Sequence, residues 1–162
     1  YVKNNKNKIE VTDKLLAWKS DNNSKINKIH NLISNLSPYV KWESGYNEKD
    51  INKEFLNKYG FFELIGPTGH FKTSKMALYV NFLDDNVCYP WHNHEAEELY
   101  FIVSGEAKFE SKDNETKILS STNTRYHESY KPHQITTTNN KILSFVIWKD
   151  KFQKVSEILK YK

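Results

Sequence analysis

Apolar side chains in the first third of the chain lie at helical spacing. Between residues 12 and 36 the apolar positions are Leu15, Leu16, Trp18, Ile26, Ile29, Leu32, Ile33 and Leu36. This pattern predicts a helix that Thr12 or Asp13 caps, that breaks near residues 21–23, and that ends before the Ser-Pro pair. Residues 47–59 repeat the spacing and predict a second, shorter helix.

From Phe61 onward the spacing of apolar side chains changes from helical to alternating. Short segments rich in β-branched and aromatic residues are separated by Gly, Asn, Asp or Ser, which predicts short strands joined by tight turns. The segments are 61–66, 75–83, 99–105, 106–111, 116–121, 134–138 and 141–148. Such a series is typical of an all-β sandwich or barrel.

The β region is flanked by helical patterns. The tail, residues 151–160, returns to helical spacing and predicts a short C-terminal helix. At 162 residues and 19.2 kDa the chain can bury one good core, and a second full domain would hardly fit. We therefore expect a helical extension over residues 1–60 that packs on a β-barrel domain over residues 61–162.

Charge and cysteine content exclude several classes of protein. The net charge is +4, but lysines alternate with asparagines and acids, which is typical of a solvated surface and argues against nucleic-acid binding. Cys88 is the single cysteine, so no intrachain disulfide can form, and we expect a cytoplasmic location. No apolar run is long enough for a membrane span, and no signal-peptide layout opens the chain. The chain begins at Tyr1, so the sequence leaves open whether an upstream segment has been removed.

The segment YPWHNHEAEELYFIVSG, residues 89–105, gathers polar side chains at the mouth of a predicted buried strand. Residues of equal parity in a strand face the same side, so His92 and His94 project together. Glu98 and Tyr100 follow them if the intervening turn keeps the register. Burying these groups costs on the order of several kcal/mol unless they are satisfied. A divalent metal satisfies two imidazoles and a carboxylate at once, so the pattern indicates a metal site.

The spacing H-x-H-x(3)-E-x(6)-G that starts at His92 resembles the first signature of the cupin superfamily. Asn86 stands where that signature usually has glycine, a departure that affects a turn and not a ligand. A later Pro-His pair resembles the looser second signature. The resemblance implies a double-stranded β-helix (jelly-roll barrel) and one divalent transition metal per chain, either Fe, Mn, Ni, Co or Zn. The implied metal ligands are His92, His94, Glu98 and His133.

Other polar residues offer alternatives to this ligand set. A lone H-x-H pair is more often decoration or a hydrogen-bonded core pair than a metal site, and the added glutamate and Pro-His reverse that balance. His127 competes with His133, which we prefer because it follows the proline. Residues that we expect to be structural, solvated or at most peripheral are His30, His70, Glu95 and Glu97.

Further segments look like those of the cupin-type dimethylsulfoniopropionate (DMSP) lyases. They are FELIGPTG at 62–69, YP at 89–90, AEELY at 96–100, HxSxxPH at 127–133 and LSFVIW at 143–148. The helical first third also resembles the N-terminal extension of longer members, so the likeness covers residues 15–151. It implies a carbon–sulfur lyase that converts DMSP into dimethyl sulfide and acrylate by β-elimination.

The resemblance also implies roles for two tyrosines. Tyr100 matches the family's catalytic tyrosine, two residues past the metal glutamate, and is the expected general base. A free phenol with a pKa of about 10 is a poor base at neutral pH, but a nearby divalent cation favours the phenolate. Tyr89 matches a family position used in substrate contact and is the second candidate for catalysis.

The sulfonium end of DMSP is a cation that aromatic faces hold well. The chain is 14% aromatic, which supplies candidates for such a box. These candidates are Tyr89, Trp42, Tyr46, Tyr126 and Trp148. Each has a competing interpretation as a core or rim aromatic, which we favour for Trp148. The helical extension either closes the pocket as a lid or packs on the barrel.

Three other functions stay open from the sequence. One is a non-catalytic cupin that binds a small carboxylate, and another is a cupin dioxygenase or isomerase. The third is a lyase-like cupin that acts on another small carboxylate. The expected partner is a small zwitterionic carboxylate. We expect binding to neither nucleic acid nor membrane, and a monomer or homodimer.

Overall fold

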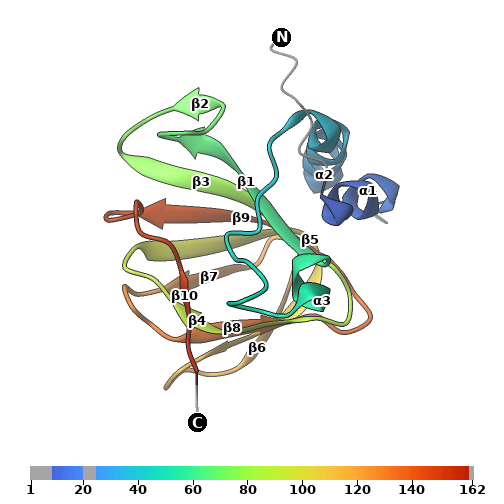
Figure 1. The fold of residues 1–162 in the computed structure, drawn as a ribbon. Coiled ribbons are helices and arrows are strands. Elements are labelled where there is room, and N and C mark those ends of the chain that lie inside the picture. Colours follow the sequence, from blue (N-terminus) through green and yellow to red (C-terminus); the bar gives the residue numbers. More distant parts are fainter. Residues whose placement is uncertain (1–8, 20–24, 161–162) are drawn as a thin grey trace.

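The computed structural model describes residues 9–19 and 25–160, and strands make up most of it (Figure 1). The helices are α1 (Glu10–Ala17), α2 (Lys25–Leu36), the 3₁₀ turn η1 (Ser37–Tyr39) and α3 (Lys53–Leu56). The strands are β1 (Tyr59–Gly66), β2 (Phe71–Lys72), β3 (Met76–Leu83), β4 (Cys88–Asn93), β5 (Glu97–Ser111), β6 (Lys117–Ser120), β7 (Thr124–His127), β8 (His133–Thr136), β9 (Ile142–Lys149) and β10 (Glu157–Ile158). The mainly β fold with N-terminal helices is therefore confirmed. Within the described ranges, every helix is too short or too polar to cross a bilayer.

The strands form one strongly curled sheet whose two halves share β5 (Figure 1). The strand order is β10-β4-β8-β5-β9-β3-β1-β2, and β6 and β7 also pair with β5. The first half of β5 pairs with β9 and β7, and the second half pairs with β8 and β6. Gly105 lies between the halves with φ +80°, and a Cβ there would collide with the Lys141 carbonyl. Glycine thus lets β5 turn from one half into the other.

Alternation along the strands sends side chains into two separate cores. The inner face between the two halves buries an apolar cluster that includes Tyr59, Leu83, Tyr100, Ile102, Phe109, Ile135 and Val146. The outer face of β1, β3 and β9 is covered by the helices, in a second cluster that includes Val11, Leu15, Ile33, Phe62, Val80, Phe82 and Leu143. The helices α1 and α2 therefore lie against the outside of the sheet (Figure 1).

His30 connects α2 to the sheet. Its ring is fully buried, with Nδ1 2.9 Å from the Ser104 hydroxyl and Nε2 3.0 Å from the carbonyl oxygen of Trp18. The ring also packs edge-on against the Trp18 indole at 4.8 Å. Both ring nitrogens are satisfied, so His30 has the structural role expected from the sequence.

Asp84, just after β3, joins the helical layer to the sheet. Its carboxylate is 2.8 Å from Nζ of Lys14 on α1 and also accepts a hydrogen bond from Lys141. Burial alone would raise the pKa of Asp84, but the bonds from the two lysines outweigh it and lower the pKa below its usual value. The charged carboxylate therefore stabilises the fold above a pH of about 4, and this stabilisation is lost as the pH falls through the lowered pKa.

Replacing Asp84 with asparagine should lower the free energy of unfolding at pH 7 by about 1–3 kcal/mol, because two charged hydrogen bonds are lost. The difference between variant and parent should shrink as the pH falls through the lowered pKa of Asp84, because the parent carboxyl is then itself protonated. Urea unfolding at pH 7 and at a series of lower pH values measures this. Asp85→Asn is the matched control, since Asp85 also pairs with Lys141 but has a side chain 39% exposed. Equal losses in the two variants would contradict the prediction.

The N-terminal helical predictions are correct in kind but not in extent. The pattern over residues 12–36 forms two helices, and the predicted break at 21–23 lies outside the described residues. The cap of α1 is Ile9, one turn earlier than predicted. The helix predicted over 47–59 shrinks to α3, where Asn52 accepts a bond from the Phe55 backbone N–H at 2.8 Å and the preceding residues form turns.

The predicted C-terminal helix is wrong. Residues 151–154 form turns, and β10 then pairs antiparallel with β4, placing Ile158 opposite His92. The backbone N–H of Leu159 also donates to the carbonyl oxygen of Trp91 at 2.8 Å. Since β4 would otherwise be an edge strand with open backbone groups, an extended tail satisfies hydrogen bonds that a helix would leave open. The segments 99–105 and 106–111, predicted as two strands, are the single strand β5.

Asn86, which stands where the cupin signature usually has glycine, lies in the turn before β4. Its φ is +52°, in the left-handed region that glycine adopts most easily. Asparagine tolerates this region better than most side chains, so the turn into β4 keeps its shape.

Candidate active site

Strand pairing brings four histidines and one glutamate to the inner face of the barrel. The residue pairs His92–His133 and Glu98–His127 lie directly opposite each other in the β4–β8 and β5–β7 ladders. His94 follows β4 in the turn that leads into β5. All five side chains are at most 3% exposed. Side chains from four separate segments thus meet in one buried cluster.

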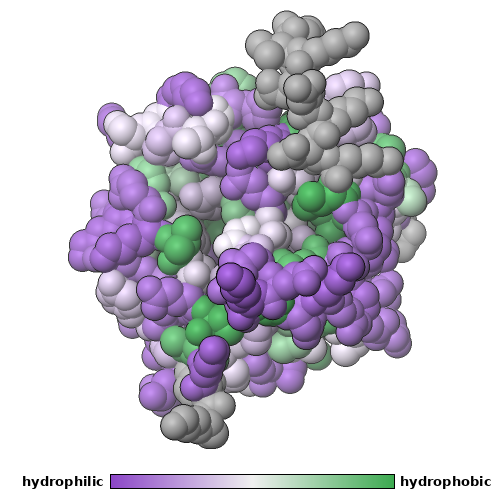
Figure 2. Space-filling view, in the orientation of Figure 1, coloured by the Kyte–Doolittle hydropathy of each residue, from purple (hydrophilic) through white to green (hydrophobic). Residues whose placement is uncertain are grey.

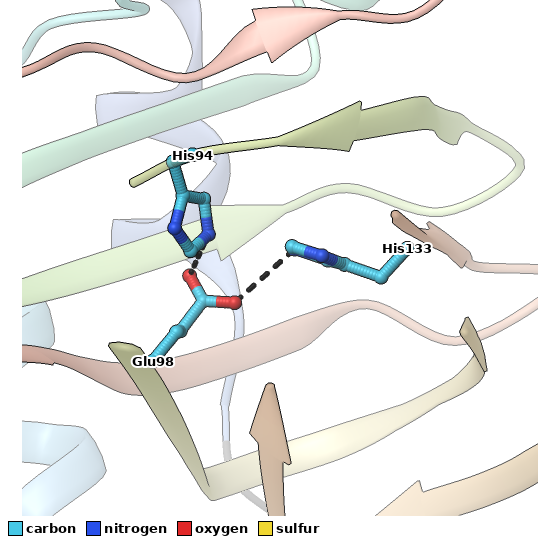
Figure 3. Close-up of side chains that lie close together, drawn as sticks. All are labelled: His94, Glu98 and His133. Atoms are coloured by element: carbon cyan, nitrogen blue, oxygen red, sulfur yellow. Dashed lines mark ion pairs between the residues drawn. The ribbon is translucent and has the colours of Figure 1, made fainter. Parts of the chain in front are cut away.

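The carboxylate of Glu98 is at the centre of this cluster (Figure 3). Its Oε1 lies 3.3 Å from Nε2 of His94, and its Oε2 lies 3.1 Å from Nε2 of His133. Potential ligand atoms of His94, Glu98 and His133 all lie within 4.8 Å of one another. His92 borders this group, with its ring centre 4.1 Å from that of His133 and 6.4 Å from that of His94.

The imidazoles are oriented by backbone carbonyls. Nδ1 of His92 donates to the carbonyl of Pro90 at 2.7 Å, and Nδ1 of His94 donates to that of Ala96 at 2.9 Å. Nδ1 of His133 donates likewise to the carbonyl of Lys131 at 2.8 Å. These bonds place the proton on Nδ1 and leave the Nε2 lone pair free, as in histidines that bind metals.

The Nε2 atoms of His94 and His133 test whether a metal fits. Both are buried without a hydrogen-bond partner in the part of the chain that the structure describes. Lone pairs so close to a carboxylate would repel it, so each Nε2 needs either a proton or a bound cation between the two groups. A divalent metal therefore fits the residues present.

The electrostatics of the cluster follow from burial and proximity. Burial would raise the pKa of Glu98, but in the metal-free protein the positive charges that His94 and His133 carry when protonated, together with the hydrogen bond from His127, lower the pKa well below its ordinary value. Burial lowers the pKa of His92 strongly and that of His127 as well, whereas for His94 the negative charge of Glu98 outweighs burial and raises the pKa. Glu98 is thus an anion, and His92 and His127 are neutral, which is the state in which such groups bind cations.

A cavity of about 660 Å³ opens above Glu98, His92 and His94. Charged and polar side chains line part of its wall, and an aromatic part is formed by Tyr46, Tyr59, Phe61, Tyr79, Tyr89, Tyr100, Trp148 and Phe152. The chain around Tyr46 and the C-terminal residues 152–156 also line it, and both segments run across the near side of the sheet in Figure 1. The surrounding surface is mostly hydrophilic, with only small hydrophobic areas (Figure 2).

Comparison with known proteins gives the family. A family model described as dimethylsulfoniopropionate lyase matches residues 3–144. The chain belongs to the DMSP lyase family. A curated relative, DMSP lyase DddQ of Ruegeria pomeroyi, is 30% identical over 110 residues, which cover 68% of this chain. The chain spans about half the length of that relative, 55%.

Solved structures support the family and its fold. A chain from crystal structures of the DMSP lyases RdDddP and RnDddQII is 29% identical, with a TM-score of 0.92 over 99% of this chain and 83% of that chain. A cupin-like protein from Thermotoga maritima has a TM-score of 0.54 at 12% identity, over 62% of this chain and 75% of that chain. This second likeness shows the fold alone. The cupin fold expected from the sequence is confirmed.

In this member of the DMSP lyase family, most of the predicted site residues lie together. The three close groups His94, Glu98 and His133 have His92 beside them. The predicted residues that line the adjoining cavity are Tyr46, Tyr89, Tyr100 and Trp148. The hydroxyl of Tyr46 lies 2.6 Å from that of Tyr89, and the Tyr89 ring stacks on His92 at 3.8 Å.

Two predicted aromatic residues lie elsewhere. Trp42 is 2% exposed, packs against Phe62 at 5.0 Å in the outer core, and donates from Nε1 to the carbonyl of Ser37. Tyr126 is 51% exposed on β7, because alternation there turns its neighbour His127 inward. Neither lines the cavity formed by the described residues, so their assignment to the aromatic box is corrected.

The sequence interpretation missed several cavity residues. Tyr79 and Asn81 line it from β3, and Tyr59 lines it from β1. A signal was available on β3, where Val80 and Phe82 alternate with a tyrosine and an asparagine. His127 was considered only as a rival to His133, whereas its Nδ1 donates to Glu98 Oε2 at 2.8 Å.

Proposed function

We propose that this protein is a metal-dependent DMSP lyase that forms dimethyl sulfide and acrylate. Membership of the family supports the proposal, and one feature of the site carries it. Buried imidazole Nε2 atoms face a carboxylate at the floor of a cavity whose lining includes several tyrosines and a tryptophan. A small zwitterionic carboxylate needs a cation at one end and aromatic faces at the other, which such a cavity offers.

We assign one divalent transition metal per chain to the floor of the cavity. His94, Glu98 and His133 would hold it, and His92 would be the fourth ligand. When bound, such a cation attracts the substrate carboxylate and favours the phenolate form of a nearby tyrosine. Imidazoles with one carboxylate suit Fe, Mn, Ni, Co or Zn alike.

Tyr100 is the proposed general base. It is buried and lines the cavity from β5, two residues past Glu98 and on the same face. In the proposed reaction its Oη takes the proton from the α-carbon of DMSP. The electron pair of that C–H bond forms the carbon–carbon double bond of acrylate. The bond from the β-carbon to sulfur breaks, and its electron pair leaves with dimethyl sulfide.

Tyr46, Tyr89 and Trp148 are proposed to receive the sulfonium. Trp148 lines the cavity and is tilted over His94, with ring centres 4.4 Å apart. The hydrogen bond between the two tyrosine hydroxyls fixes their rings. Together these rings exclude water from the leaving group and present faces that attract a cation.

Headspace gas analysis tests the proposal. Protein loaded in turn with each candidate metal and supplied with DMSP should release dimethyl sulfide and equal amounts of acrylate. Removal of the metal by a chelator should abolish the release. Binding of DMSP without gas release would instead favour a carboxylate-binding cupin, and oxygen uptake would favour a dioxygenase. The cytoplasmic location and the monomeric or homodimeric state stay predictions.

A further inference from the structure

Each oxygen of the Glu98 carboxylate has two nitrogen neighbours of opposite kinds. Oε1 accepts a hydrogen bond from Trp148 Nε1 at 2.8 Å and lies 3.3 Å from Nε2 of His94. Oε2 accepts a hydrogen bond from His127 Nδ1 at 2.8 Å and lies 3.1 Å from Nε2 of His133. One donor and one imidazole lone pair thus meet each oxygen.

The two donors lie on the strands β9 and β7, which both pair with β5, the strand of Glu98. In the sheet, Glu98 lies opposite Trp148 of β9 and opposite His127 of β7. The side chains of Glu98 and His127 are 2% and 1% exposed. His127 does not line the cavity, so water cannot replace its N–H without a change in the structure, and an unpaired carboxylate oxygen there would be costly.

The same two residues also pack against the imidazoles. The His127 ring stacks on that of His133, with centres 4.0 Å apart and planes 20° apart. The Trp148 ring lies over that of His94 at 4.4 Å. Each residue therefore contacts one carboxylate oxygen and one imidazole, so together they fix the relative positions of all three groups.

We propose that His127 and Trp148 are positioning residues, a clamp of two N–H donors that holds both Glu98 oxygens toward His94 and His133 and thereby sets the affinity for the metal. The inference rests on the metal site of the proposed function but not on lyase activity. Outer partners of metal ligands typically contribute about 10–100-fold to metal affinity. The clamp is the equivalent pair of partners for Glu98.

Affinity for Co²⁺ tests the clamp, because Co²⁺ binding is followed both by chelator competition and by its visible absorption spectrum. His127→Leu removes one donor, and Trp148→Phe removes the other while keeping an aromatic ring over His94. Each should raise the Kd for Co²⁺ by about 10–100-fold. His127→Asn, which can place an amide N–H near the position of Nδ1, should recover most of the affinity.

His30→Leu is the matched control, since it removes another fully buried histidine from outside the cavity. It should lower stability and leave the Kd for Co²⁺ unchanged, which separates donor loss from general destabilisation. Equal losses in His127→Leu and His127→Asn would overturn the clamp, as would unchanged affinity in both His127→Leu and Trp148→Phe. If the spectrum of Co²⁺ bound to His127→Leu showed one ligand fewer than in the parent, His127 would be a ligand. That result would also overturn the clamp. If the parent binds Co²⁺ but releases no dimethyl sulfide, the lyase proposal fails and the clamp stands.

Discussion

His133→Ala should abolish the proposed metal binding and with it the proposed release of dimethyl sulfide. The substitution deletes an imidazole whose Nε2 lies 3.1 Å from Glu98 and has no hydrogen-bond partner among the described residues. Outer partners of ligands already contribute about 10–100-fold, so loss of a ligand should weaken metal binding by at least about 100-fold. Elemental analysis after gel filtration, together with gas release, measures both effects.

Replacing different histidines with alanine should remove different amounts of metal, according to how close each imidazole lies to the Glu98 carboxylate. His94→Ala should match His133→Ala, because both imidazoles face the same carboxylate. His92→Ala should lose less of the metal, since the ring of His92 lies beside the group of His94, Glu98 and His133 and is not part of it. His70→Ala, at an exposed histidine near the mouth, should keep full metal content. Full metal content in His133→Ala would contradict the ligand assignment and make His127 the next candidate.

The alternation of side chains along a strand was enough to predict the part of the site that lies on β5. Glu98 and Tyr100 share a face because β5 is continuous there, so equal parity was sufficient. His94 lies beyond the end of β4, where parity no longer applies, and the hydrogen bond from Nδ1 to the Ala96 carbonyl orients it. His133 could be placed beside them only through the resemblance to cupins.

Features that depend on distant pairing were beyond reach of the sequence. The tail has helical spacing, yet β4 offers backbone partners that turn it into β10. Trp42 looked free to reach the pocket, but the helices bury it against Phe62. Trp148 was predicted for the aromatic box or the core, and the bond to Glu98 exists only because β9 pairs with β5 at that residue.

Tyr100→Phe should abolish elimination while metal and substrate still bind. Burial raises the pKa of Tyr100 well above its ordinary value, and the negative charge of Glu98 raises it further, so the phenol stays protonated in the metal-free protein. The substitution removes one oxygen and keeps the ring, which packs on Phe109 at 5.3 Å, so the strand should keep its structure. Loss of a general base typically costs about 10²–10⁴ in rate, so kcat should fall at least about 100-fold with little change in KM.

Tyr89→Phe is the comparison that assigns the base, because Tyr89 is equally buried at the same cavity. It loses the 2.6 Å hydrogen bond to Tyr46 but keeps the ring that stacks on His92. This variant should therefore raise KM and lower kcat far less than Tyr100→Phe does. Steady-state kinetics with DMSP, on variants checked for equal metal content, separates the two roles. A Tyr100→Phe variant with half the parent's kcat would refute Tyr100 as the base, and a large loss of kcat in Tyr89→Phe would transfer that role to Tyr89.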